Sequence, residues 1–410
     1  LSSAPGSTWA SSPSKAHPPD YPDHPENPAS GNPGKPGKPT QKLSPVDPAY
    51  TALLALLEAG IWERPVASLE PFRLTPAQWQ QVYQLAVRQT VTGIAYRGIH
   101  HIPDQLLPPD AIMIRWAATA DQIERRNRRM DAALASLTQR MRLAGITPVV
   151  LKGQAIAALY PHPLLRECGD IDLYFRTPDE ATAAAQLMQQ AGCQLQSHAD
   201  GSVSYAWQGF EVEHHTRLFD IYSPFQQRRL ASIVERYGFV EQTISAPGVE
   251  PFAVTVPAPI PTLLMLSVHL LKHMMGHGVG LRQFCDIAVA YSALAGQYSR
   301  DELRAIYRSL RLTRWGKKLN TFLIHTLSAP ISSLPYRDCA PSPSPAMLRI
   351  VLDGGNFGQY GSTRGNAQQG ALARKWRTFR SYLSHVPFSI SAAPGEAFWN
   401  LATLITGNIR

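Results

Sequence analysis

The chain has 410 residues, 44% of them hydrophobic, 17% charged and 9% aromatic, and its formal net charge is +9. This composition excludes a wholly disordered or collagen-like protein and is sufficient for one large or two ordinary globular domains. The four cysteines contain no CxxC pair, which argues against a disulfide framework and a zinc knuckle. No stretch reaches the roughly 18 apolar residues of a membrane span, so we expect a soluble, cytoplasmic protein.

Residues 1–48 are predicted to form a disordered, proline-rich arm. They hold 12 of the 35 prolines and balance four lysines against four acidic residues. Without apolar periodicity, such a segment cannot offset the entropy lost when its backbone is ordered. The net positive charge therefore comes from residues 49–410. By itself, this charge does not show whether the binding partner is nucleic acid, a nucleotide phosphate, an acidic protein surface or anionic lipid.

The first folded section, residues 49–145, is predicted to be helical. Apolar residues recur three and four positions apart at 53–57, 79–86 and 112–143, which is the pattern of amphipathic helices. Thr75 followed by Pro76 is typical of a helix start. The last of these helices carries a cationic patch, which we interpret as a solvated face, with an acidic partner or RNA as the alternative; it consists of Arg125, Arg126, Arg128 and Arg129.

Residues 146–256 change to a mixed α/β pattern. The β-branched run at 149–151, closed by Lys152 and Gly153, predicts a buried strand followed by a tight turn. We expect further elements in this order: a helix at 154–160, a strand at 171–175, a helix at 178–191, and strands at 203–207 and 210–215.

Helical patterns return in residues 257–330, at 262–275, 281–295, 300–309 and 314–327. Residues 331–410 form a basic tail rich in glycine and proline, with a last short helix expected at 397–405. The predicted fold class is therefore α+β, in which a small mixed sheet forms the core and helical sections flank it on the N-terminal and C-terminal sides.

Asp170 and Asp172 are the first candidates for chemistry. Alternate side chains of a strand share a face, so these carboxylates point the same way while Ile171 and Leu173 point to the core. Neighbouring carboxylates repel each other unless a cation lies between them, and hard oxygen ligands suit Mg²⁺. The alternative is a solvated strand end without function.

Two other segments favour the metal interpretation. Lys152 and Gly153 supply a cation and a glycine turn before a helix whose N-terminal amides can receive a triphosphate. In the strand at 210–215, Glu213 and His215 share one face with Glu211. Glu213 therefore offers a third carboxylate.

Together, these residues resemble a known family, the uncharacterised nucleotidyltransferases of the polymerase-β-like superfamily. The matching motifs occur in the family's order and span about half of the chain: Val150-Leu151-Lys152-Gly153, Tyr160-Pro161, Arg166, Gly169-Asp170-Ile171-Asp172-Leu173, residues 212–218, residues 280–288, and Gly354-Gly355-Asn356-Phe357-Gly358. The resemblance implies an Mg²⁺-dependent nucleotidyltransferase core at 146–256. Such an enzyme transfers a nucleoside monophosphate from a nucleoside triphosphate, with AMP from ATP as the expected case, to an unidentified hydroxyl or phosphate acceptor. The reaction releases pyrophosphate.

The resemblance also implies roles for single residues. Two Mg²⁺ ions are held by the acidic residues Asp170, Asp172 and Glu213. The nucleotide is bound by Lys152, Gly153, Arg166 and Gly169, and the two cations of this set neutralise phosphate charge. A second layer around them consists of His215, Arg282 and Asp286. Many relatives have serine after the glycine of the turn, whereas this chain has Gln154, so a serine contact to the terminal phosphates is not implied.

Several alternatives remain open from the sequence. Arg282 and Asp286, four residues apart, suit either an ordinary helix ion pair or a contact with the nucleotide or acceptor. His269, His273 and His277 have the spacing of a helical metal stripe, but packing and hydrogen bonding beside the site, through Asp286 for example, is the preferred interpretation.

The function also has alternatives. The fold can belong to an inactive nucleotide-binding or scaffold protein, or the basic, aromatic segment 356–395 can bind RNA. We favour the enzyme and expect no nucleic acid partner, with a small molecule, a peptide or a protein side chain as the acceptor.

Overall fold

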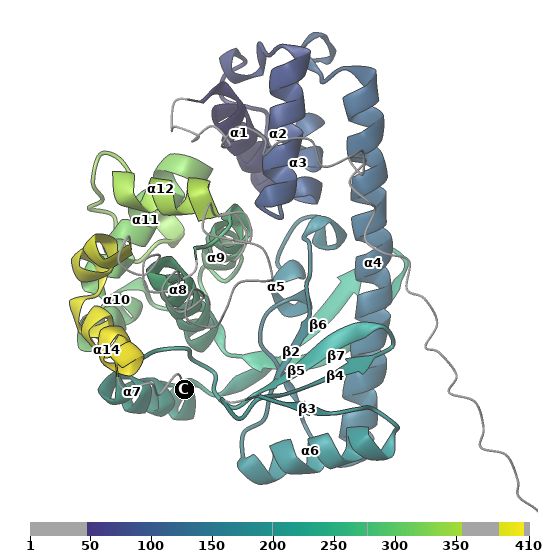
Figure 1. The fold of residues 1–410 in the computed structure, drawn as a ribbon, viewed down its shortest axis with the longest axis vertical. Coiled ribbons are helices and arrows are strands. Elements are labelled where there is room, and N and C mark those ends of the chain that lie inside the picture. The colour runs from purple at the N-terminus through teal and green to yellow at the C-terminus, as the bar shows by residue number, and fades with distance from the viewer. Residues whose placement is uncertain (1–46, 199, 277, 355–384, 406–410) are drawn as a thin grey trace, which may run out of the picture. The chain divides into compact units, whose positions relative to one another are not determined.

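The computed structural model describes residues 47–198, 200–276, 278–354 and 385–405 (Figure 1). Residues 1–46 of the predicted arm, residues 355–358 of the C-terminal motif and most of the basic segment 356–395 lie outside these ranges, and helix α1 already begins at Pro48. Among the described residues, no helix has the length and apolarity that crossing a bilayer requires.

Four helices open the described chain: α1 (Pro48–Trp62), α2 (Pro76–Arg88), α3 (Thr92–Ile99) and α4 (Asp110–Leu143). The start of α2 is as predicted, since the Thr75 hydroxyl accepts a hydrogen bond from the Gln78 backbone and the Gln78 side chain accepts one from the Thr75 backbone. Helices α1 and α3 pack very closely, because a Cβ added at Gly98 would collide with the backbone of Leu56.

The central sheet has seven strands: β1 (Val149–Val150), β2 (Ile171–Tyr174), β3 (Gln196–Ser197), β4 (Val203–Trp207), β5 (Phe210–His215), β6 (Phe239–Ala246) and β7 (Val249–Pro257). Their order is β3-β4-β5-β2-β1-β7-β6. The pairs β2–β5 and β1–β7 are parallel, and the other neighbours are antiparallel. A mixed sheet among helices confirms the predicted α+β class.

The two faces of the sheet pack against different helices. Ile171, Leu173 and Val212 join a core with residues of α4 and of α6 (Pro178–Gln190). Tyr174 and Val149 belong instead to a larger core that includes α7 (Pro224–Tyr237) and α8 (Pro259–Gly276). Because side chains alternate along a strand, Asp172 faces the α7–α8 side.

Further helices are α5 (Gln154–Ala157), α9 (Leu281–Ala293), α10 (Arg300–Ser309), α11 (Thr313–Leu327), α12 (Pro345–Gly354) and α14 (Pro394–Ile405), and residues 385–392 are helical as well. Residues of α1, α8, α9 and α11 share the larger core, where the rings of Phe284 and Phe322 stack at 4.1 Å. Helix α5 is shorter than the predicted 154–160, because Pro161 disfavours helical backbone in the residue before it.

Candidate active site

Asp172 and Glu213 face each other on adjacent parallel strands. The register of β2 and β5 pairs Asp172 with Glu213 and Tyr174 with His215, so alternation brings Asp172, Glu213 and His215 to one face. One ligand atom from each of these three side chains lies within 4.8 Å of the others. Among the described residues, these three side chains form the one group of potential metal ligands close enough to share an ion.

Lys152 and His215 lie against the same oxygen of Asp172. Lys152 Nζ is 3.3 Å from Asp172 Oδ1, and His215 Nε2 is 2.5 Å from it. Burial opposes ionisation of Asp172, but Lys152 and His215 outweigh it and hold its pKa far below the ordinary value. Burial likewise opposes the charges of Lys152 and His215, yet the carboxylates beside them raise both pKa values. The Asp172 carboxylate is therefore buried beside a lysine and a histidine that favour its charged form.

Asp170 stands one residue before β2 and is not part of this cluster. Burial, and then the negative charge of Asp172, raise the pKa of Asp170, so the two carboxylates sense each other. Gly153 has φ +53°, a backbone conformation that favours glycine, and a Cβ added there would lie 3.3 Å from the Asp170 carbonyl oxygen. The predicted glycine turn thus lies beside the start of β2, next to the exposed Gly169.

Asp220, His269 and Lys272 form a second charged cluster near Lys152. Lys272 Nζ lies 3.1 Å from Asp220 Oδ1, and His269 Nδ1 lies 3.7 Å from Asp220 Oδ2. Burial and the charge of Lys152 lower the pKa of His269 to about 4. His269 therefore pairs with Asp220 and not with Asp286, and His277 of the proposed histidine stripe lies outside the described residues. No sequence signal pointed to Asp220, which lies between β5 and α7.

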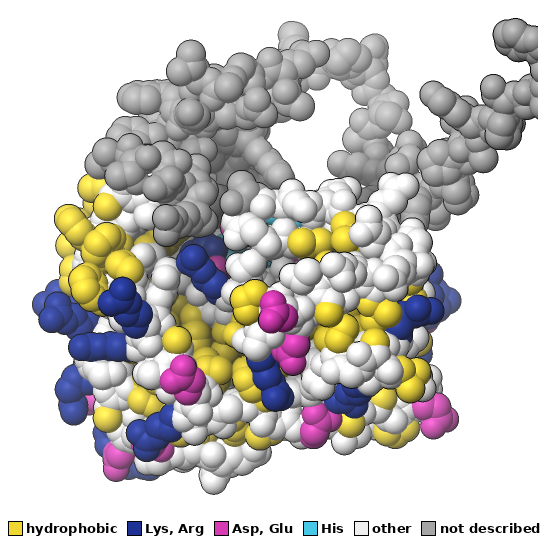
Figure 2. All heavy atoms as spheres, turned by 90° about the horizontal axis from the view of Figure 1, so that it is seen from below, with side chains coloured by type: hydrophobic (Ala, Val, Ile, Leu, Met, Phe, Trp, Pro, Cys, Tyr) yellow, Lys and Arg dark blue, Asp and Glu magenta, His cyan; other side chains and the backbone are white. Residues whose placement is uncertain are grey.

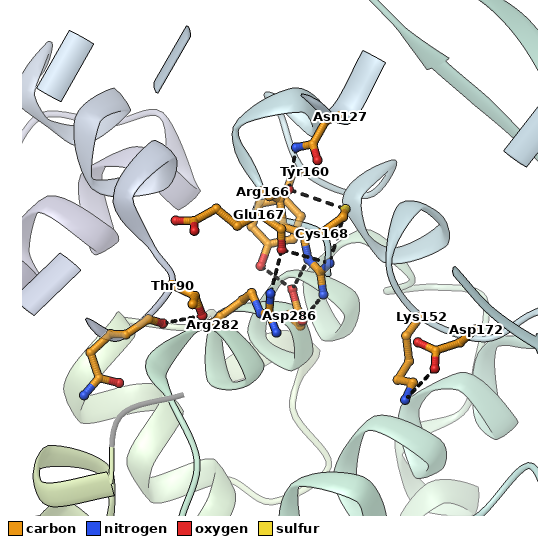
Figure 3. A network of polar contacts seen from close by, with 11 residues as sticks. Thr90, Asn127, Lys152, Tyr160, Arg166, Glu167, Cys168, Asp172, Arg282 and Asp286 are labelled. Atoms are coloured by element: carbon orange, nitrogen blue, oxygen red, sulfur yellow. Dashed lines mark hydrogen bonds and ion pairs between the residues drawn. The ribbon is translucent and has the colours of Figure 1, made fainter. Parts of the chain in front are cut away.

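Arg166 and Asp286 form a buried ion pair at the centre of a polar network (Figure 3). Arg166 Nη2 lies 2.6 Å from Asp286 Oδ2 and Arg166 Nε lies 3.0 Å from Asp286 Oδ1, while the Tyr160 hydroxyl donates to the latter oxygen at 2.8 Å. Figure 3 shows the Lys152–Asp172 pair to one side of this network. The Arg166 guanidinium is thus engaged by Asp286, away from the acidic cluster.

Arg282 also has a partner other than Asp286. Its Nη1 donates to the Glu167 carbonyl oxygen at 2.8 Å, so among the described ion pairs Asp286 belongs to Arg166. Arg126 of α4 donates to the Gly169 carbonyl oxygen at 2.8 Å. Contacts from α4 and α9 therefore fix the segment that leads into β2 and its two aspartates.

The cationic patch of α4 is largely neutralised locally. Arg128 pairs with Glu124 at 2.8 Å and Arg125 pairs with Asp121, each one helical turn away. Together with the contact of Arg126 to the backbone before Asp170, this agrees with a structural role for the patch.

Comparison with known proteins assigns the chain to a family. Residues 75–318, more than half of the chain, match the family model described as uncharacterised nucleotidyltransferase. The chain belongs to this family. It is thus an enzyme of the nucleotidyltransferase type, and the matched range contains every candidate site residue named above. No curated protein and no solved structure matches this nucleotidyltransferase significantly.

Proposed function

We propose that this nucleotidyltransferase moves the nucleoside monophosphate of a nucleoside triphosphate, ATP in the first instance, to a hydroxyl or phosphate oxygen of an acceptor. The observation that carries the proposal is the pair Asp172 and Glu213, which face each other on parallel strands with ligand atoms within 4.8 Å of each other and of His215. In the same chain a glycine turn lies beside the start of β2.

The donor set suits a divalent cation. Mg²⁺ prefers oxygen ligands at about 2.1 Å, so two ligands of one ion are at most about 4.2 Å apart. The ligand atoms of Asp172, Glu213 and His215 lie within 4.8 Å of one another, which is compatible with this range after a small adjustment of the side chains. Lys152 and His215 already lie against Asp172, so a bound ion would share this carboxylate with them. Asp170, whose pKa responds to Asp172, is the candidate ligand of a second ion. When bound, the ions would neutralise triphosphate charge and stabilise the attacking and leaving oxygens.

The residues of the chain bind and orient the substrates. Gly153, which lacks a Cβ, allows phosphate oxygens to approach the backbone of the turn. Lys152 supplies a positive charge between this turn and Asp172. His215 keeps Asp172 oriented by its 2.5 Å contact, while Arg166 and Asp286 hold the segment that precedes β2. Phosphoryl chemistry needs little covalent help, so positioning and electrostatics supply most of the rate.

The atoms of the reaction balance as follows. An acceptor oxygen forms a bond to the α-phosphorus, the bond from that phosphorus to the bridging oxygen breaks, and pyrophosphate leaves with the electron pair. The proton of a hydroxyl acceptor passes to solvent.

The test is pyrophosphate release from each of the four common nucleoside triphosphates with Mg²⁺ and a low-molecular-mass cell extract as the acceptor source. Asp172→Asn and Glu213→Gln are each expected to lower the rate by at least ~100-fold, since each removes a metal-binding charge. Glu250→Gln, which changes an exposed carboxylate of the β6–β7 hairpin, is the matched control and should be unchanged. Pyrophosphate release that survives both site substitutions would refute the proposal. An inactive scaffold would bind triphosphate without releasing pyrophosphate.

A further inference from the structure

A pocket of about 560 Å³ lies next to the acidic cluster. Its walls come from the end of β2 and Arg176 beyond it, from residues 216–219 that follow β5, from α7 and from the start of β6. Apolar and aromatic side chains form much of the lining, with two arginines and one glutamate among them. The underside of the molecule carries a hollow of similar character, with hydrophobic side chains inside and charged ones around it (Figure 2).

The pocket continues the sheet face that carries the carboxylates. Tyr174, which lines the pocket, is two residues after Asp172 on β2 and therefore on the same face, about 6.6 Å further along at ~3.3 Å per residue. Its partner across the strands is His215. The pocket thus begins one side-chain step beyond Asp172 and Glu213.

The glycine turn lies in the opposite direction along β2. Gly153 is beside the carbonyl of Asp170, before the strand begins, whereas Tyr174 and Arg176 of the pocket are at and beyond its end. Asp172 and Glu213 lie between the two. In nucleotidyl transfer the attacking and leaving oxygens lie on opposite sides of the phosphorus, roughly in line with it. If the triphosphate binds at the glycine turn, the acceptor must therefore approach from the side of the pocket.

We infer that this pocket binds the acceptor, and that the acceptor is a small molecule carrying an anionic group, a phosphate or a carboxylate, on an apolar or ring-shaped body. This inference rests on the proposed nucleotidyl transfer. The oxygen that attacks the α-phosphorus is a hydroxyl or phosphate oxygen of the same molecule, its proton passes to solvent if it is a hydroxyl, and pyrophosphate is released on the turn side.

The lining supports this chemistry. Arg176 and Arg217 are exposed at the pocket, and within the described part of the chain neither guanidinium forms an ion pair, so both can bind an anion. Arg176 lies over the Phe239 ring at 5.0 Å from its centroid, and Tyr174 stacks on Phe239 at 6.3 Å. The aromatic pair offers a surface for a ring or an apolar body, while Glu235 is the one acidic residue of the lining. Arg176 and Arg217 are thus assigned as specificity-determining residues.

Binding can be tested without turnover, by calorimetric titration of the full chain with phenyl phosphate and with benzoate as probes. Benzyl alcohol, which lacks the charge, and inorganic phosphate, which lacks the ring, should bind more weakly than at least one of the two probes. The double substitution Arg176→Gln/Arg217→Gln should weaken binding of that probe by at least ~10-fold, because charge-assisted hydrogen bonds are lost. Arg228→Gln, on the exposed side of α7 and outside the lining, is the control. Comparing phenyl phosphate with benzoate distinguishes a phosphate-bearing from a carboxylate-bearing acceptor.

Two binding results would overturn the inference. Probe affinity that is unchanged in the double variant would show that the arginines do not bind the anion. Affinity that is lost instead in Lys152→Gln would place the probe at the glycine turn, where the triphosphate is proposed to bind.

Turnover tests the acceptor role itself. A low-molecular-mass extract, separated into neutral and anionic fractions, is incubated with α-labelled ATP and Mg²⁺. The label should pass to a compound of the anionic fraction, and the double variant should raise the KM for that fraction by at least ~10-fold while the KM for ATP stays within about twofold. Labelling of the neutral fraction, or an unchanged acceptor KM, would contradict the inference.

Failure of the proposed function has a different signature. If Asp172→Asn leaves pyrophosphate release unchanged, nucleotidyl transfer at this site is refuted and the acceptor role falls with it. The phenyl phosphate and benzoate titrations then still decide whether Arg176 and Arg217 form an anion-binding pocket.

Discussion

Arg166 and Asp286 join the segment before β2 to helix α9 through a two-point ion pair, with N–O distances of 2.6 and 3.0 Å. Both side chains are buried. Family resemblance implies that Arg166 binds phosphate. In the structure its Nε and Nη2 donate to Asp286 and its Nη1 lies 3.3 Å from the Glu167 carbonyl oxygen. We therefore predict a positional contribution, in which Arg166 fixes the segment from which Asp170 and Asp172 emerge.

Removing one partner of this pair should destabilise the protein. Asp286→Asn leaves the buried Arg166 guanidinium without a counter-charge, and such changes cost about 3–5 kcal/mol. The measurement is the free energy of unfolding in urea. The double variant Arg166→Met/Asp286→Leu, which has no buried charge, should recover most of the loss. Equal destabilisation in the single and double variants would contradict a paired role.

An exposed ion pair provides the comparison. Lys317 Nζ lies 2.5 Å from Asp338 Oδ2 at the surface, and Lys317→Met should leave the free energy of unfolding almost unchanged, because solvent screens an exposed pair.

The close crossing of α1 and α3 predicts a second stability effect. At Gly98, an added Cβ would overlap the backbone of Leu56, so Gly98→Ala should force the two helices apart and cost about 2–4 kcal/mol, in the upper range of overpacking. Gly395 of α14 has open space around its Cβ position. Gly395→Ala should therefore be neutral or stabilising by up to about 1 kcal/mol through helix propensity. Thermal unfolding of both variants tests the contrast.

The strands that carry the acidic cluster were predictable because the signal is local. Acidic and apolar residues alternate at 170–173 and at 210–213, which indicates strands, and β2 and β5 occur there. The capping residues Thr75 and Pro76 likewise marked the start of α2. Glycine after Lys152 indicated a turn, and Gly153 has a positive φ.

The partners of these residues were not predictable, because they depend on register and on packing between distant segments. Family resemblance grouped Asp172 with Glu213, but no local pattern sets the register that pairs them. Nothing in the sequence pairs Arg166 with Asp286 or His269 with Asp220. The hairpin β6–β7 was also missed, since many of its residues are exposed or half-buried and its sequence shows no sustained alternation. The roles of Asp170, Gly169 and Arg282 at the nucleotide stay predictions.

Asp131 predicts a pH-dependent contribution to stability. It is buried in α4, and burial raises its pKa to about 7, whereas an unfolded chain has about 3.9. The folded state therefore binds the extra proton, so the contribution of Asp131 to stability is full below about pH 4, falls as pH rises to about 7, and is constant above it.

Asp131→Asn should remove this slope. Relative to wild type, the variant should gain up to about 4 kcal/mol between pH 4 and 7, at about 1.4 kcal/mol per pKa unit. The difference between the two proteins is the quantity to measure, because the lowered pKa values of His214 and His269 act with the opposite sign in the same window. A pH-independent difference in urea unfolding would show that folding does not raise the pKa of Asp131.

Lys152 should have opposite effects on metal and on nucleotide. It lies 3.3 Å from the Asp172 oxygen proposed to hold the ion, so without nucleotide Lys152→Gln should tighten Mn²⁺ binding several-fold by removing a competing charge. The same change should raise the KM for ATP, because a cation near the phosphates is lost. Titration followed by electron paramagnetic resonance measures free Mn²⁺. Asp172→Asn should weaken binding at least ~10-fold, and tighter binding in that variant would argue against a metal site.

The most direct test is to determine which phosphate bond of ATP the enzyme breaks. ATP labelled differently at the α- and γ-phosphates is incubated with Mg²⁺ and the anionic extract fraction, and the products are separated. We predict that the γ label appears in pyrophosphate while the α label appears in equal amount on the acceptor, and that Asp172→Asn abolishes both. Release of the γ label as orthophosphate, or its transfer to the acceptor, would contradict nucleotidyl transfer at Asp172 and Glu213.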